Sequence, residues 1–241
     1  MTRGARLGLF AVSSAVLAGL VVWGLTGLPA FGDFHGEYGR ILNSVAGTER
    51  HVTNVVSAVV FDYRGFDTLG EEFILFTAAM GVALLLREAR DDRERPRDEV
   101  RSDAVRAIGL ALVGPTVVLG LYIVAHGYLT PGGGFQGGVA LAGGLVLLYV
   151  AGRYRSYRAA SPHVLVDVAE GVGAGSYVVV GIAALIAGAA YLGNVVDLGT
   201  KGTLAAAGTI PVLNAAAGLE VAAALVLLFH EFLEEVMYPD E

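Results

Sequence analysis

The sequence has no cysteine and few charged residues. Without cysteine the chain forms no disulfide, has no thiol chemistry and offers no cysteine ligand to a metal ion. Only 16% of its 241 residues are charged, whereas soluble domains have about 25%. The net charge is −7, and no basic cluster of the kind that binds nucleic acid is present. Because 55% of the residues are apolar, the composition indicates a membrane protein.

The apolar residues form long runs. A membrane-spanning helix needs about 20 mostly apolar residues. A run near the C-terminus, Ala215–Val236, is apolar apart from Glu220 until it reaches His230 and Glu231. Five other runs meet the requirement: Ala5–Leu25, Thr68–Leu86, Val105–Ala125, Phe135–Gly152 and Val172–Leu192. The sequence therefore predicts an all-α membrane protein with about six transmembrane helices.

The first apolar run resembles a signal peptide, because Arg3 and Arg6 precede it. It is longer, however, than the usual apolar core of 7–15 residues. It also leads into a polar segment without a small-residue cleavage pattern. We therefore expect a retained first helix.

The distribution of basic residues predicts the orientation, since such residues concentrate in cytoplasmic loops. With the N-terminus inside, twelve of the sixteen lysines and arginines fall on the cytoplasmic side. Only Arg40, Arg50, Arg64 and Lys201 fall on the other side. Both termini are thus predicted to be cytoplasmic, with the glycine-rich segment at residues 126–138 outside.

A charged segment divides the chain. Residues 87–103 carry charges of alternating sign and one proline, which we interpret as a solvated cytoplasmic linker. The predicted organisation is a two-helix unit at residues 1–90, the linker at 91–103 and a four-helix unit at 104–241.

The glycine-rich segment at residues 126–138 reads HGYLTPGGGFQGG and connects two predicted spans. Glycine permits backbone shapes and close contacts that a side chain would forbid. His126 is a candidate proton relay at the membrane edge, or a residue whose hydrogen bond holds this loop. We take the remainder as a structural motif: Pro131, Gly132, Gly133, Gly134, Phe135, Gln136, Gly137 and Gly138.

Small residues spaced four apart predict close helix packing in the membrane. Gly134, Gly138 and Ala142 form one such series, and Gly171 and Gly175 form another. Because four helices offer few interior positions, we expect several of these faces to meet other subunits.

Ionisable side chains inside a span are costly, so each is a candidate functional residue. If the last helix begins near Asn214, Glu220 lies six residues inside it, about 9 Å along the axis. A buried carboxyl group that gains and loses a proton can carry protons. Alternatively, Glu220 pairs with a basic or amide group on a neighbouring helix as a structural latch.

Two further acids share one helical face: Asp167 and Glu170 lie three residues apart. Ser161 and Pro162 precede them as an expected N-cap and first helical residue. This places both acids in the first turns, where we expect them to be solvated anchors. We expect His230 and Glu231 to form a similar pair at the membrane interface.

Residues 53–71 contain a second polar motif. The apolar stretch Val55–Phe61 is too short to span a membrane and predicts a short helix or strand-like element, at the outer surface or among partner helices. Thr68 and Glu71 match a capping box at a helix start. Asp62, Arg64 and Asp67 either neutralise one another around a turn or, with Glu71 and Glu72, gather cations or protons at an entrance.

These motifs resemble those of a known family. Residues 126–138 resemble the signature of the MnhB domain, which is the B subunit of Mrp-type multisubunit sodium/proton antiporters. The resemblance covers roughly Arg101–Met237 and includes Pro211–Asn214 and Gly218–Val221. Asn54–Glu71 is similar to the C-terminal end of the large A subunit of these antiporters and to the equivalent small subunit of membrane-bound hydrogenases. The chain therefore resembles a fusion of that segment to an MnhB domain.

The resemblance implies a plasma-membrane subunit of a complex that exchanges sodium ions for protons. Its partners would be the other antiporter subunits and membrane lipid, and no cofactor is implied. In that family the antiporter-like channels lie in larger subunits with buried lysines. The only lysine here, Lys201, falls in a predicted outer loop, which favours a role in assembly and in lining an ion path.

The sequence supports three other functional classes less well. An independent carrier is disfavoured because the halves lack paired discontinuous spans. A membrane subunit of a hydrogenase-type redox complex remains an alternative, since such complexes have the same ion-translocating module. An enzyme is not expected, because the sequence shows no nucleophile constellation, no metal-ligand spacing and no phosphate-binding loop.

Overall fold

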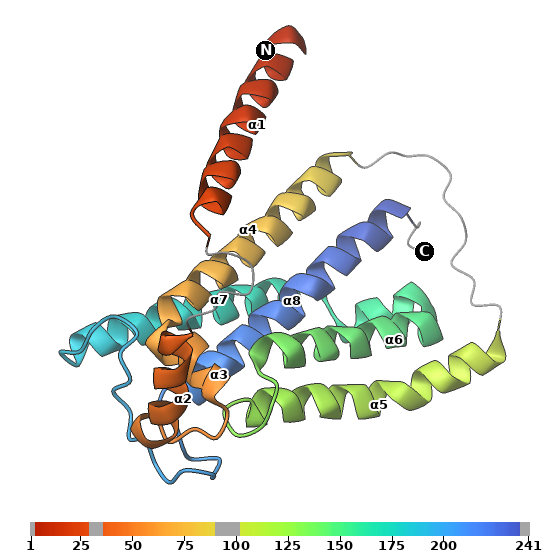
Figure 1. Ribbon diagram of the computed structural model, residues 1–241. Coiled ribbons are helices and arrows are strands. Elements are labelled where there is room, and N and C mark those ends of the chain that lie inside the picture. Colours follow the sequence, from red (N-terminus) through yellow and green to blue (C-terminus); the bar gives the residue numbers. More distant parts are fainter. Residues whose placement is uncertain (1–2, 29–35, 90–101, 237–241) are drawn as a thin grey trace. The chain divides into compact units, whose positions relative to one another are not determined.

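The computed structural model describes residues 3–28, 36–89 and 102–236 (Figure 1). These residues form α-helices and one π-helical turn, and no strand occurs among them. The long helices are α1 (Arg3–Thr26), α4 (Gly65–Ala89), α5 (Asp103–His126), α6 (Gly134–Ala160), α7 (His163–Ile186) and α8 (Ile210–Val236). All six are long and apolar enough to cross a membrane. The predicted all-α fold with six spans is therefore confirmed.

The chain divides into two compact units, residues 1–41 and 42–241. The first contains α1 and the start of α2 (Glu37–Glu49). The second contains α3 to α8, so α4 belongs to the same compact unit as the four helices that follow it. Most of the predicted linker at 91–103 lies outside the described residues, and the proposed division at residue 90 stays a prediction.

Helix α8 is the centre of the larger unit. It packs against α4, α6 and α7 and also touches α5, and Figure 1 shows it between α4 and α6. Its buried positions are mostly small or aliphatic, including Ala217, Val221, Ala224 and Leu227. Small side chains let neighbouring helices approach closely where lipid provides no hydrophobic driving force.

The Gly134 and Gly138 face of α6 packs on α8 within the same chain. A Cβ atom at Gly138 would lie 2.7 Å from the carbonyl oxygen of Gly218, closer than atoms can approach. This face is therefore filled within the chain and is not one of the faces expected to meet other subunits. Gly171 and Gly175 on α7 have open space beside them, so their face stays available to a partner.

Two predicted helix starts are wrong. Helix α4 begins at Gly65, so Thr68 lies inside it; its hydroxyl donates to the Val60 carbonyl at 2.6 Å instead of capping. Helix α7 begins at His163, and the Ser161 hydroxyl donates to the Tyr157 carbonyl, four residues earlier in α6, at 2.7 Å. In both cases a carbonyl of the preceding helical segment was the better acceptor.

The short element before α4 is helical, which is one of the two forms predicted from the sequence. Helix α3 (Val55–Ala58) continues into the π-helical turn η1 (Val59–Tyr63), and the Asn54 side chain accepts from the Val56 amide at the start. Helix α6 has a break at Arg153, where φ is 66°. The break comes directly after Gly152, the predicted end of that span.

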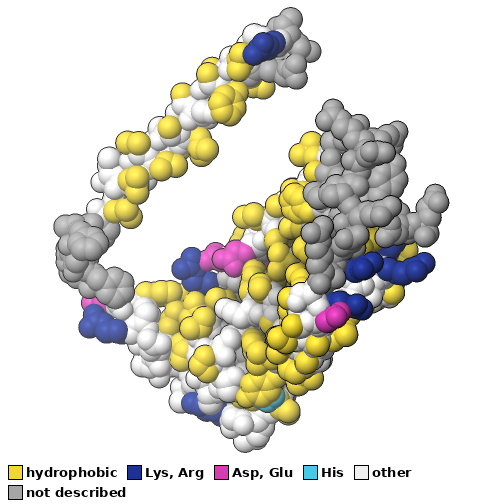
Figure 2. Space-filling view, turned by 90° about the vertical axis from the view of Figure 1, so that its right-hand side faces the viewer, with side chains coloured by type: hydrophobic (Ala, Val, Ile, Leu, Met, Phe, Trp, Pro, Cys, Tyr) yellow, Lys and Arg dark blue, Asp and Glu magenta, His cyan; other side chains and the backbone are white. Residues whose placement is uncertain are grey.

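Large hydrophobic side chains are exposed along the long helices. On α5 they include Leu110, Val118 and Leu121, and on α7 they include Val164, Val172 and Val179. Figure 2 shows hydrophobic side chains spread over one face of the molecule. Such large apolar surfaces are covered by lipid or by protein partners.

Candidate functional site: buried carboxyl groups and a clamped glycine loop

Four glutamates are buried inside the helix bundle, with at most 1% of their surface exposed: Glu72 on α4, Glu170 on α7, and Glu220 and Glu231 on α8. Glu231 lies beside His230 in the last turns of α8, and the other three form a separate group. Each lies on the packed face of its helix. Glu72 is seven residues before buried Ala79, and Glu170 is seven residues before buried Tyr177. Residues seven apart lie on one helix face, so the acids point inward from three helices.

Helices α7 and α8 touch closely beside Glu220. A Cβ atom at Gly173 would lie 2.7 Å from the backbone nitrogen of Glu220, so only glycine allows this approach. Glu170 is one turn away from Gly173 on α7. Glu170 and Glu220 therefore lie at adjoining levels of the same helix interface. The expectation that Glu170 is a solvated anchor is wrong, because its face of α7 packs inside the bundle.

The three carboxyl groups are not fully hydrogen-bonded. Both carboxyl oxygens of Glu72 and of Glu220, and Oε1 of Glu170, are buried without a hydrogen-bond partner among the described residues. Burying such a polar group unpaired costs about 1–3 kcal/mol. A structural latch at Glu220 would need a basic or amide partner, and the described part of the chain supplies no hydrogen bond to it.

Helix α8 starts at Ile210 rather than near Asn214. Glu220 is therefore ten residues inside the helix, about 15 Å along its axis. This is roughly the middle of a hydrocarbon core about 30 Å thick. The depth is greater than the sequence predicted.

The other predicted acids lie elsewhere. Glu71 and Asp167 are exposed. Asp62 pairs with Arg50, whose Nε lies 2.6 Å from Oδ1, and Asp67 pairs with Arg64. Asp62 is thus neutralised by a residue outside its predicted cluster. These two acids form ion pairs with arginines at the margin of the bundle, and the structure does not bring them together with Glu72.

A polar surface cluster surrounds the Arg50–Asp62 pair. Burial lowers the pKa of the Arg50 guanidinium, but the hydrogen bond and charge of Asp62 outweigh this and raise it overall. Burial, and then the hydrogen bond to Glu49, raise the pKa of Tyr63 to about 12. Arg50 also lies over the Tyr63 ring, 5.0 Å from its centre. The cluster holds the segment before α3 against η1.

Two asparagines clamp the glycine-rich segment. Asn214 on α8 donates to the Val124 carbonyl and accepts from the Gly134 amide at 2.7 Å. Asn54 donates to the carbonyls of Gly127, at 2.6 Å, and Thr130, at 3.0 Å. Segments far apart in sequence therefore meet at this loop. The sequence placed Asn54 and Asn214 in the family motifs but did not indicate their role as clamps.

His126 does not hold the glycine loop with its side chain. Its Nδ1 lies 3.1 Å from the Tyr122 carbonyl, and its ring stacks on that of Tyr122 with centres 4.1 Å apart. Its backbone carbonyl accepts instead from the Leu129 and Thr130 amides, both at 2.8 Å. Gly132 has φ of 129°, a conformation that side chains disfavour. Gln136 is exposed.

His230 and Glu231 are buried inside the bundle, with 0% and 1% exposure, so they are not solvated, and their place at the membrane interface stays a prediction. The His230 ring packs among aromatic side chains, 4.5 Å from the ring centre of Tyr157 and 4.5 Å from that of His163. Helix α8 continues to Val236 and carries these residues into the bundle instead of to its surface.

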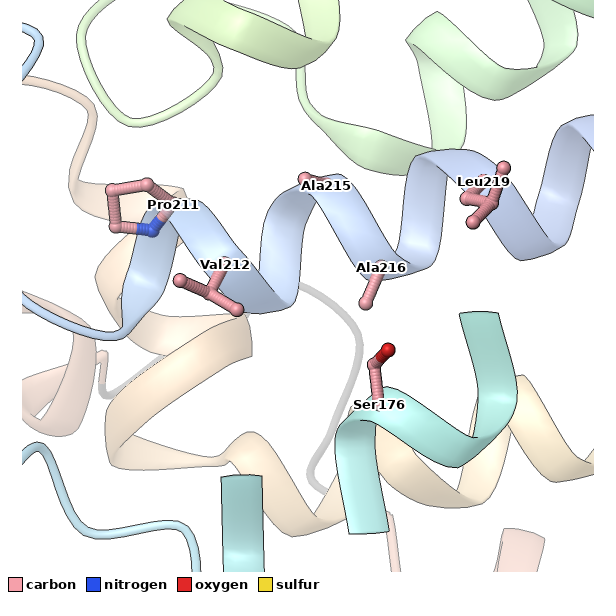
Figure 3. Close-up of a pocket in the computed structure, with 6 residues that line it drawn as sticks. All are labelled: Ser176, Pro211, Val212, Ala215, Ala216 and Leu219. Carbon is pink, nitrogen blue, oxygen red and sulfur yellow. The ribbon is translucent and has the colours of Figure 1, made fainter. Parts of the chain in front are cut away.

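An apolar groove of about 440 Å³ lies between α7 and α8. Figure 3 shows Ser176 pointing from α7 towards α8 near Ala216. The other lining residues, Pro211, Val212, Ala215 and Leu219, all come from α8. None of the buried acids lines this groove, and its apolar walls suit a lipid chain or a protein surface better than an ion.

Comparison with protein families gives two matches along the chain. Residues 104–227 match the domain related to the MnhB subunit of Na⁺/H⁺ antiporters. Residues 11–101 match MbhE, the E subunit of MBH. The first match contains Glu170, Glu220, Asn214 and the glycine loop, and the second contains Asn54 and Glu72.

Two relatives extend these matches. An uncharacterized protein of Methanocaldococcus jannaschii is 30% identical over 210 residues, covering 76% of this chain and 78% of that protein. A probable K⁺/H⁺ antiporter A/B subunit of Rhizobium meliloti is 34% identical over 153 residues. That alignment covers 50% of this chain but only 15% of the longer relative.

Two solved structures have the same fold. A chain of the membrane-bound sulfane sulfur reductase, an archaeal respiratory membrane complex, has a TM-score of 0.71 and 31% identity. The alignment covers 95% of this chain and 98% of that chain. A chain of the Mrp complex from Dietzia sp. DQ12-45-1b has a TM-score of 0.67 and 26% identity, covering all of this chain and 27% of that one.

Proposed function

Because this chain belongs to the family of domains related to the MnhB subunit of Na⁺/H⁺ antiporters, we propose that it is a membrane subunit of a cation/proton antiporter complex. Within that complex it supports assembly, and its buried acids line part of an ion path. The complex exchanges protons for a monovalent cation, and sodium is the cation we propose. The row of buried, incompletely hydrogen-bonded glutamates carries this proposal.

The positions of the acids support a path through the bundle. By its place in α4, Glu72 lies about 10 Å from the end that begins at Gly65. Glu220 lies near mid-depth, and Glu170 lies about 10 Å from the end of α7 that begins at His163. The three carboxyl groups thus differ in depth. Acids at successive depths inside a membrane protein are the usual components of proton relays.

The fold also supports a role as one part of a larger assembly. The apolar surfaces of α5 and α7 and the open face at Gly171 and Gly175 are available for contact with other subunits. The similar structures come from multisubunit membrane complexes. We further propose a plasma-membrane location with both termini in the cytoplasm, in agreement with the arginine distribution.

Gentle purification and transport measurements together test this function. The full chain, tagged and extracted in mild detergent from its native cells, should carry antiporter subunits identifiable by mass spectrometry. Inverted vesicles from a deletion strain should lose cation-dependent proton exchange, and the wild-type gene should restore it. A chain that purifies alone, with exchange unchanged by the deletion, would contradict the proposal.

A membrane component of a respiratory redox complex is the second candidate. The match to MbhE and the likeness to the sulfane sulfur reductase chain favour it. The same purification distinguishes the two, because redox subunits with iron–sulfur or nickel centres would replace the antiporter subunits among the companions.

A further inference from the structure

A second polar cluster, separate from the three buried acids, joins the start of α7 to the last turns of α8. It consists of His163, His230 and Glu234. One potential ligand atom from each residue lies within 4.8 Å of the other two. Two imidazole nitrogens and one carboxylate oxygen form a ligand set that Zn²⁺ binds in proteins.

The hydrogen bonds of His230 prepare it to accept a cation. Its Nε2 lies 2.7 Å from the Ser161 carbonyl oxygen, which can only accept, so Nε2 carries the proton. In the neutral ring Nδ1 then holds a lone pair. Nδ1 is buried and has no hydrogen-bond partner among the described residues. A buried nitrogen lone pair without a donor is suited to binding a metal ion.

Glu234 is held in position by its neighbours. The Tyr154 hydroxyl donates to Oε1 at 2.6 Å, and Nε2 of His163 lies 2.9 Å from the same oxygen. Outer hydrogen bonds of this kind orient metal ligands and commonly change affinity about 10–100-fold. His230 and Glu234 are also four residues apart, so they lie on one face of α8.

The cluster is reachable from the surface. The side chain of His163 is 27% exposed and that of Glu234 is 13% exposed, although His230 is fully buried. An ion can therefore enter past His163 and contact His230 at the inner side. Small side-chain movements would bring the three ligand atoms to the distances of about 2.0–2.2 Å found in zinc sites.

The geometry points to a binding site for a divalent transition-metal ion, with Zn²⁺ as the best match, at His163, His230 and Glu234. Water would complete the coordination, as in other three-ligand zinc sites. Binding would replace the hydrogen bond between His163 and Glu234 and requires both histidines in their neutral form, so zinc affinity depends on pH. The ion would tie the start of α7 to the end of α8. This site is independent of the proposed ion path.

Zinc binding to the purified full chain in detergent tests the site. After incubation with Zn²⁺ and dialysis, wild-type protein should retain about one ion per chain by elemental analysis. Zinc affinity should fall as the pH is lowered and the histidines become protonated, and bound Co²⁺ should give the visible spectrum of a site with a low coordination number. Absence of bound zinc in folded wild-type protein would overturn the proposal.

Variants identify the ligands. His163→Asn should weaken zinc binding at least tenfold, and Tyr154→Phe, which keeps all three ligands, should weaken it by about 10–100-fold. His126→Asn is the matched control, because that histidine lies at the far end of α5 beside Tyr122, and it should bind zinc like wild type. His163→Asn protein with an unchanged helical circular-dichroism spectrum and unchanged affinity would also overturn the assignment.

Discussion

A buried carboxyl group that lacks a hydrogen-bond partner needs a compensating reason to persist. At Glu220 the free-energy cost of burying the carboxyl group is larger than near a helix end, because the residue lies about 15 Å inside α8 and has no exposed surface. An apolar residue at this site would pack against Gly173 without that cost. The cost is understandable when the group must take up and release a proton or contact a partially dehydrated cation.

Glu220→Gln should therefore remove most of the cation-dependent proton exchange of the complex and leave its assembly intact. Glutamine has nearly the same shape but neither ionises nor carries a proton. Exchange is measured in inverted vesicles by a pH-sensitive dye, and assembly is measured by the subunits that co-purify. The matched control is Asp167→Asn, because Asp167 is an acid on α7 that is exposed. Unchanged exchange with Glu220→Gln would reject the ion-path role of this residue.

Asn214 has a structural role that can be measured separately. Its side chain satisfies the Gly134 amide and the Val124 carbonyl, and each buried group left unpaired costs about 1–3 kcal/mol. Asn214→Ala should thus lower the thermal midpoint of the purified chain by several degrees. Asn43→Ala, at an exposed position of α2, should leave the midpoint unchanged. Equal midpoints for wild type and Asn214→Ala would show that the clamp does not stabilise the loop.

At the scale of helices, close packing depends on glycines at specific contacts. Gly138 lies on the α6–α8 interface, where an added Cβ would be 2.7 Å from the Gly218 carbonyl oxygen and 2.8 Å from the Val221 Cβ. The first neighbour is backbone and cannot move aside without shifting α8. The same shift would disturb Glu220, which lies two residues after Gly218.

Gly138→Val should therefore destabilise the chain and reduce the amount of intact complex, since overpacking typically costs about 1–3 kcal/mol. Gly171→Val is the informative comparison, because an added Cβ at Gly171 would meet no other part of the described chain within 4 Å. If Gly171 faces a partner, its valine variant should leave the isolated chain stable and still reduce co-purifying subunits. Wild-type yield and stability for Gly138→Val would contradict the packing described here.

The long helices could be predicted from the sequence, but their contacts could not. Runs of apolar residues identify spans because the bilayer requires them. The predicted end at Gly152 coincides with the break at Arg153. Which face of α7 is buried depends on where α8 lies, so the sequence alone could not show that Glu170 is buried. Thr68 and Ser161 do not act as caps, because their hydroxyls donate to carbonyls of the preceding helical segments, Val60 and Tyr157.

At the scale of the whole molecule, the chain contains a segment that matches MbhE, residues 11–101, followed by a segment that matches the MnhB-related domain, residues 104–227. In space the two segments are not independent. Helix α4, from the first segment, packs on α8 from the second, and Asn54 from the first clamps the glycine loop of the second. Glu72 enters the interior formed with α7 and α8 through this packing. Joining the two segments in one chain therefore keeps the proposed path residues together.

The proposed orientation can be tested with a single residue, because Lys201 is the only lysine of the chain and is exposed in the segment between α7 and α8. If both termini are cytoplasmic, Lys201 faces outside and the N-terminal amine faces inside. A membrane-impermeant amine reagent should then label the protein in intact cells at Lys201, as located by mass spectrometry. Lys201→Arg should abolish this labelling and keep the charge. Labelling of Lys201 only after the membrane is permeabilised would show the opposite orientation. The result would also give the side of the glycine-rich loop, because the Tyr128 hydroxyl donates a hydrogen bond to the Leu204 carbonyl in the segment that contains Lys201.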